Sequence, residues 1–129
     1  MRDHYRTFFG LQKEPFGTSV PLKDIMETPD VIGVKERIDY VVRLGAVGLV
    51  TGDVGSGKST ALKYAGGGFH PSEYRLLHLT ASSGSILELY RQLLCELGMD
   101  TAGTSRTIMT RKIKKDILEL MQGKKMKTV

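Results

Sequence analysis

The sequence predicts an α/β fold in which helices flank a parallel sheet in three layers. An apolar run at 45–50 has the length and Val/Leu content of a buried strand. A glycine-rich loop at 52–60 follows it directly, and a helical pattern follows the loop. This order brings loop N–H groups and a helix N-terminus together around an anion, so we predict a phosphate-binding domain.

The loop fits the pattern G-x-x-x-x-G-K-[ST] without a mismatch. Its glycines permit close backbone approach to a phosphate, and Lys58 supplies an ammonium group to the β and γ oxygens. Lys58 is therefore the catalytic candidate, Ser59 the predicted Mg²⁺ ligand, and Thr60 a backbone donor near the α-phosphate. Asp53 is interpreted as a turn former. The predicted cofactors are ATP and Mg²⁺, and the predicted nucleotide-binding residues are Gly52, Asp53, Val54, Gly55, Ser56, Gly57, Lys58, Ser59 and Thr60.

Composition limits the other classes of site. The single cysteine, Cys95, excludes a disulfide framework and lies in an apolar helical pattern, which predicts burial. The three histidines have no metal-ligand spacing. No apolar run approaches the roughly 20 residues of a membrane span, and the N-terminus lacks a signal core, so the prediction is a cytoplasmic protein.

The remaining elements follow from periodicity and capping signals. Residues 5–30 form an aromatic and proline-rich arm with one short helix, which either lies beside the nucleotide base or covers the edge of the core. A helix is predicted from Asp30, its N-cap, to Gly45. A strand at 74–80, parallel to the first, precedes a helix that opens with a capping box at Ser85. The last helix spans about 104–122, and a third strand begins in 124–129.

Hydrolysis needs a carboxylate on Mg²⁺, usually at the end of an apolar strand. The acidic residues after the second predicted strand all fall on predicted helices or a turn: Glu88, Glu96, Asp100, Asp116 and Glu119. We therefore predict that the chain binds nucleotide but that its hydrolysis activity is defective.

The pattern Tyr5-x-x-Phe8-Phe9-Gly10-Leu11, then Pro15-Phe16, a helix and the 52–60 loop, resembles the bacterial AAA+ ATPases of the ExeA type. That group includes the general secretion pathway A protein and ATPases that assist DNA transposition. The resemblance implies an arm at 1–30 and, at 31–129, the N-terminal part of an AAA+ domain. It also implies that the chain stops before the Walker B strand, sensor 1, the arginine finger and the helical lid. The run at 66–68, three glycines, departs from the family pattern.

Two other functions remain open at this stage. The net charge is +5, and residues 106–129 contain eight basic but only two acidic residues. This basic helix predicts either a solvated helix face or a DNA-binding accessory fragment. An inert fragment that needs a partner chain is the other alternative. A homo-oligomer through AAA+ contacts or an exposed sheet edge is also consistent with the pattern.

Overall fold

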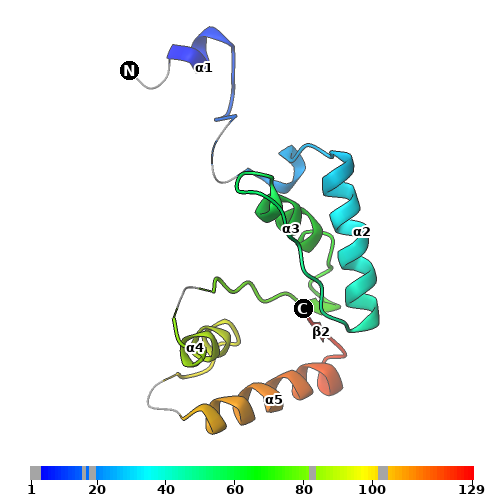
Figure 1. The fold of residues 1–129 in the computed structure, drawn as a ribbon, viewed down its shortest axis with the longest axis vertical. Coiled ribbons are helices and arrows are strands. Elements are labelled where there is room, and N and C mark those ends of the chain that lie inside the picture. The colour runs from blue at the N-terminus through cyan, green and yellow to red at the C-terminus, as the bar shows by residue number, and fades with distance from the viewer. Residues whose placement is uncertain (1–3, 16, 18–19, 82–83, 102–104) are drawn as a thin grey trace. The chain divides into compact units, whose positions relative to one another are not determined.

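The computed structural model describes residues 4–15, 17, 20–81, 84–101 and 105–129. The chain divides into two compact units, Met1–Gly67 and Gly68–Val129. Helices α1 (His4–Phe8), η1 (Leu22–Asp24), α2 (Pro29–Leu44) and α3 (Lys58–Gly66) belong to the first unit. The second unit contains β1 (Tyr74–Arg75), α4 (Ile86–Glu96), α5 (Arg106–Gly123) and β2 (Lys127–Thr128) (Figure 1).

In the first unit, α2 packs against α3. The two buried residues of α3, Ala61 and Ala65, are one helical turn apart, so this face is small enough for close helix packing. Helix α2 ends at Gly45 as predicted, with a left-handed backbone (φ 65°). Its N-cap is Thr28 and not Asp30, because the Thr28 hydroxyl accepts a hydrogen bond from the Val31 N–H at 3.3 Å. Pro29 then occupies the first helical position, where its missing N–H costs nothing.

The predicted strand at 45–50 is wrong for this structure. Residues 46–50 have no strand assignment, and the side chains of Val47 and Leu49 are 98% and 87% exposed. A buried parallel strand needs hydrogen-bonded neighbours, and the described residues of the first unit include no strand. The apolar pattern alone therefore does not produce the strand here.

The arm agrees with the prediction in its short helix but not in one of the two predicted roles of its aromatic residues, covering the edge of the core. It contains the expected short helix, α1, but Phe8 and Phe9 are 82% and 68% exposed. Their rings contact each other edge to face, with centroids 4.9 Å apart. Neither ring covers a core edge in the described residues. Phe16, the third aromatic residue of the prediction, lies outside the described residues.

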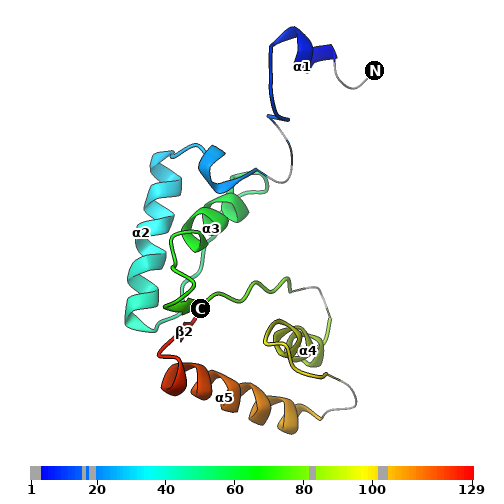
Figure 2. The same cartoon turned by 180° about the vertical axis from the view of Figure 1, so that it is seen from behind.

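In the second unit, α4 lies beside α5 (Figure 2). The two helices contribute a small core of three buried residues, Leu94, Met109 and Ile113. Apolar residues at helical spacing supply this core, and Tyr90, Leu93, Leu97 and Ile117 pack around it. Ile86 and Met121, toward the outer ends of these helices, are exposed. Cys95 is exposed as well, which corrects the predicted burial, because it lies one residue beyond Leu94 and so on another side of the helix.

Both helices of the second unit begin directly after a serine. Ser85 is the N-cap of α4, but its side chain makes no capping hydrogen bond, so the capping box is absent. Ser105 is the N-cap of α5, and its hydroxyl accepts from the Ile108 N–H at 3.5 Å. After α4, Gly98 has a positive φ of 77°, as a helix-ending glycine should.

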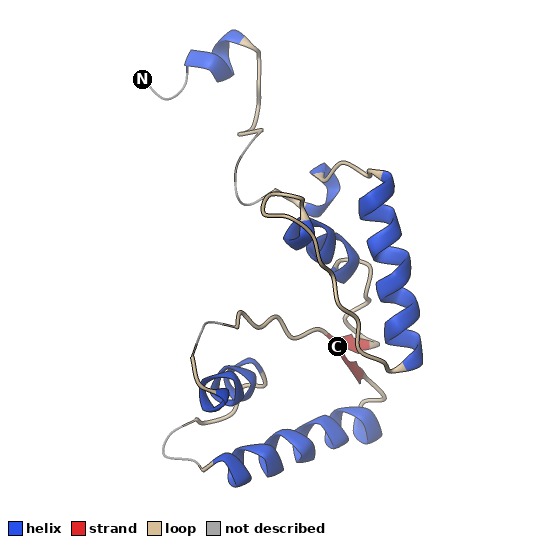
Figure 3. Cartoon of the chain, in the orientation of Figure 1, coloured by secondary structure: helices blue, strands red, loops and turns tan. Residues whose placement is uncertain are grey.

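The sheet of the second unit has two short strands. Strands β1 and β2 are parallel, and Tyr74 is paired with Lys127. The Leu77 N–H extends the pairing by donating to the Val129 carbonyl at 2.8 Å. The predicted third strand is therefore confirmed, whereas the second is much shorter than 74–80 and pairs with the third and not with 45–50. Helices predominate in the described residues, which do not show the predicted three-layer sheet (Figure 3).

Gly67, in the glycine run, accommodates the side chain of Leu22. Its backbone is ordinary for a helix end (φ −66°, ψ −14°), so conformation does not require glycine. A Cβ there would lie 2.5 Å from Leu22 Cδ1 and 3.0 Å from Cδ2. The Leu22 side chain therefore explains why glycine stands at this position, where the family pattern has another residue.

This contact predicts coupling between the two positions. We expect Gly67→Ala to lower the free energy of unfolding by about 1 kcal/mol, because Leu22 must leave its place. In a Leu22→Ala background the same change should raise stability by roughly 0.5 kcal/mol, since alanine then only restricts the unfolded chain. Urea unfolding of the four proteins measures this cycle, and equal effects in both backgrounds would contradict the contact.

Candidate phosphate-binding loop

The 52–60 loop of the first unit leads directly into α3. Helix α3 begins at Lys58, and its N-cap is Gly57, whose φ of 87° is left-handed. The Ala61 N–H donates to the Gly57 carbonyl at 2.9 Å and is the first intrahelical bond. The N–H groups of Lys58, Ser59 and Thr60 precede it and have no acceptor within the helix. These three donors form the positive end of the helix dipole.

The loop backbone closes into a narrow turn. The Ser56 N–H donates to the Asp53 carbonyl at 3.2 Å. Gly52 has φ of 155°, and a Cβ at this position would lie 2.9 Å from Ser56 Oγ. Gly52 thus suits this turn for two reasons, because its φ is one that side chains disfavour and because the Ser56 hydroxyl occupies the place of a Cβ.

Lys58 lies across this turn. Its Nζ donates to the carbonyl oxygens of Gly52 at 2.9 Å and Asp53 at 2.6 Å. These two bonds fix the ammonium group over the loop, and both accepting groups are neutral carbonyls. An anion that offers charged oxygens would be a stronger acceptor for the same ammonium.

The predicted residues do not all come together in the same way. Hydrogen bonds and close contacts join Gly52, Asp53, Ser56 and Lys58. Val54 is fully exposed at the tip of the turn, where its side chain contributes no binding group. Ser59 and Thr60 occupy the first turn of α3 and are exposed.

Ser59 is the predicted Mg²⁺ ligand, and it lies in the first turn of α3. Among the described residues, no group of three or more His, Cys, Asp or Glu side chains could hold a metal ion. A hydroxyl oxygen in the first turn of α3 is a suitable ligand for a hard cation that also binds phosphate oxygens. The types of donor in the loop thus fit the chemistry of a phosphate chain with Mg²⁺.

Sequence reasoning missed the contacts that hold the arm to α3. The Lys63 Nζ donates to the Val20 carbonyl at 2.7 Å, and the Tyr64 hydroxyl donates to Glu27 at 2.6 Å. The hydrogen bond to Glu27 raises the pKa of Tyr64, with smaller contributions from burial and the charge of Glu27. No motif marks these residues, because their partners lie 43 and 37 residues away.

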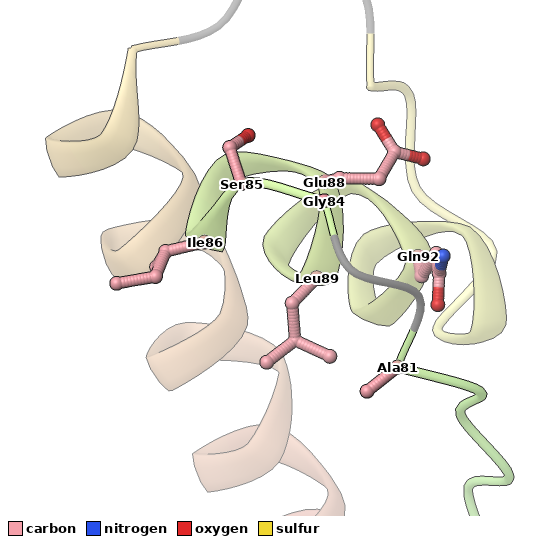
Figure 4. A pocket seen from close by; sticks show the side chains of 7 residues that line it. All are labelled: Ala81, Gly84, Ser85, Ile86, Glu88, Leu89 and Gln92. Carbon is pink, nitrogen blue, oxygen red and sulfur yellow. The ribbon is translucent and has the colours of Figure 1, made fainter.

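The second unit has a cavity of about 160 Å³ at the start of α4 (Figure 4). Its lining is mostly apolar or small: Ala81, Gly84, Ser85, Ile86, Glu88, Leu89 and Gln92. Its one carboxylate belongs to Glu88, whose Oε2 forms an ion pair with Arg91 Nη1 at 3.6 Å. This cavity offers no cluster of catalytic groups, so the 52–60 loop is the better candidate site.

Comparison with known proteins assigns most of the chain to a family. A family model described as "AAA domain" matches residues 42–126, which is more than half of the chain. A search of the curated proteins found no significant match, and a search of the solved structures found none either. No helix in the described part of the chain has the length and apolar character of a membrane span.

The matched segment includes the 52–60 loop and both helices of the second unit. AAA domains have the P-loop NTPase fold and an ATPase-like, nucleotide-binding function, and this family generally binds ATP with Mg²⁺. The chain belongs to the AAA domain family.

Proposed function

We propose that the 52–60 loop is a Walker A loop that binds the phosphates of ATP with Mg²⁺. The observation that carries this proposal is the start of α3, where three N–H groups without an acceptor in the helix follow the glycine-rich turn that the Lys58 ammonium spans. In this assignment the backbone of 52–57 surrounds the β-phosphate, and Lys58 exchanges its two carbonyl acceptors for phosphate oxygens. Ser59 ligates Mg²⁺, and the Thr60 N–H donates near the α-phosphate.

Binding and turnover are separate properties of this site. In the described residues, no carboxylate makes a hydrogen bond or ion pair with Lys58 or Ser59. The contacts of the loop thus include no acidic residue that would hold Mg²⁺ or position the attacking water. We therefore propose that this chain binds ATP and is defective in hydrolysing it.

The wider assignment is to the secretion or transposition ATPases of the ExeA type, with an arm at 1–30 and the front of the ATPase domain at 31–129. Its support is the spacing of Tyr5, Phe8, Phe9 and Pro15 before the loop. A homo-oligomer could form through contacts of the AAA+ type, or by pairing of an edge of the β1–β2 sheet with another copy of the chain. Light scattering with and without Mg·ATP distinguishes this oligomer from a monomer.

The role of Ser59 gives a direct test of the metal assignment. We expect Mg²⁺ to strengthen ATP binding to the wild-type protein, and Ser59→Ala to remove most of that gain, roughly tenfold, because one ligand oxygen is lost. Calorimetric titration of ATP in Mg²⁺ and in EDTA measures the gain.

Thr60→Ala is the matched control, since it removes a hydroxyl from the same helical turn, yet the assigned contact of Thr60 is its backbone N–H. It should retain the Mg²⁺ effect. If both variants behave like the wild type, Ser59 is not a metal ligand.

A further inference from the structure

Helix α5 has two flanks with different charge balance on either side of its buried stripe, Met109 and Ile113. One flank, together with Asp100, lines a hollow and carries two lysines and three acids: Lys112, Lys115, Asp100, Asp116 and Glu119. Lys115 Nζ lies 3.7 Å from a Glu119 carboxylate oxygen. This flank is the ordinary charge-balanced surface of an amphipathic helix.

The other flank has no acidic residue. It lines a hollow of about 480 Å³ and is defined by Arg106, Thr107, Thr110, Arg111 and Lys114, hereafter the basic flank. Its three cationic side chains are on exposed residues, and no ion pair is found for any of them in the described part of the chain. Within α5, the net positive charge thus lies on one side of the helix.

The position of these cations along the helix increases their potential. Arg106 is the first residue of α5, and the first turn has no acidic residue. The N-terminus of a helix already carries a partial positive charge, so basic residues there are unfavourable unless an anion is near. The basic flank therefore accumulates positive charge that nothing in its lining neutralises.

Arg106 is also held in place. Its guanidinium lies 5.9 Å from the centroid of the Tyr90 ring, and Tyr90 packs against the Leu94 core. The Tyr90 ring is occupied by this contact, and no aromatic side chain lines the basic flank. A ligand at this surface therefore meets charge and hydroxyl groups but no stacking platform.

We propose that the basic flank binds the phosphate backbone of duplex DNA. Arg106 and Lys114 are eight residues apart, which is about 12 Å along a helix, and one DNA strand presents a phosphate every ~3.4 Å of duplex axis. Three cations on one flank thus span a distance that includes several phosphates of one strand. Single-stranded binding sites use aromatic rings to stack bases, and this surface has none, so the preferred form is the duplex.

The test is fluorescence anisotropy of a labelled 20-base-pair duplex titrated with the full chain at several KCl concentrations. Arg111→Gln with Lys114→Gln should weaken binding about tenfold or more and reduce the slope of log affinity against log salt by about two. The matched control is Lys112→Gln with Lys115→Gln, which removes the same charge from the balanced flank and should change affinity by about threefold or less. Circular dichroism checks that both double variants are folded.

Equal weakening by both pairs would overturn the proposal, because binding would then follow net charge alone. Tighter binding to a single strand of the same length would overturn the duplex assignment, and so would a wild-type protein that does not bind at 50 mM KCl. The basic flank and the 52–60 loop belong to different units of the chain. The Lys58→Ala variant should therefore bind the duplex like the wild type. A failure of ATP binding therefore leaves this result unaffected.

Discussion

Replacing Lys58 by alanine is expected to weaken Mg·ATP binding about 100-fold. Lys58 Nζ already lies over the loop on the carbonyls of Gly52 and Asp53, so it needs little rearrangement to reach phosphate oxygens. Hydrogen bonds to charged groups contribute about 1.5–3 kcal/mol each, and a loss of roughly 3 kcal/mol corresponds to two powers of ten in affinity. Isothermal titration calorimetry gives both dissociation constants.

Lys63→Ala is the matched control for this change. It removes an ammonium from the same helix, and that ammonium also donates to a backbone carbonyl, Val20, but outside the loop. The control should bind Mg·ATP within about threefold of the wild type, because surface charges act weakly at a distance. Equal affinities of all three proteins would mean that Lys58 does not contact the nucleotide.

The second large effect is expected in the core of the second unit. Leu94 is fully buried (0% exposed) between α4 and α5, where it contacts the small cluster that includes Met109 and Ile113. Leu94→Ala removes buried methyl groups and leaves a cavity, which costs about 2–5 kcal/mol. Because this core has so few buried residues, we expect the change to unfold much of the second unit at room temperature.

Urea unfolding followed by circular dichroism measures this loss. Leu89→Ala, on the same helix and 42% exposed, makes the same chemical change outside the core and should cost less than about 1 kcal/mol. If the two variants lose equal stability, the packing of α4 on α5 is not the source of stability in this unit.

Features that depend on neighbouring residues in the chain could be predicted from the sequence. Gly45 and Gly98 end their helices with positive φ, and Ser105 caps α5, because each needs only local backbone geometry. The prediction of Asp30 as the N-cap of α2 missed Thr28, although Pro29 at the first helical position is a signal for it, and the predicted capping box at Ser85 is absent. The left-handed Gly57 at the start of α3 is likewise local, and so the shape of the candidate site follows from its motif.

Features that depend on distant partners could not be predicted in the same way. An apolar run becomes a strand only if another strand pairs with it, and 46–50 has no such partner among the described residues. Burial of Cys95, Phe8 and Phe9 depends on what packs over them, and all three are exposed. The arm contacts of Lys63 and Tyr64 bridge long stretches of chain and leave no periodic pattern.

The most direct test of the central claim is a calorimetric comparison of ATP and AMP binding to the wild-type protein in Mg²⁺. We assign the glycine-rich turn, which the Lys58 ammonium spans and from which α3 starts, to the β-phosphate, which AMP lacks. The assignment predicts a single site that binds ATP at least about tenfold more tightly than AMP. Equal affinities for the two nucleotides, or no binding of ATP at millimolar concentration, would contradict it.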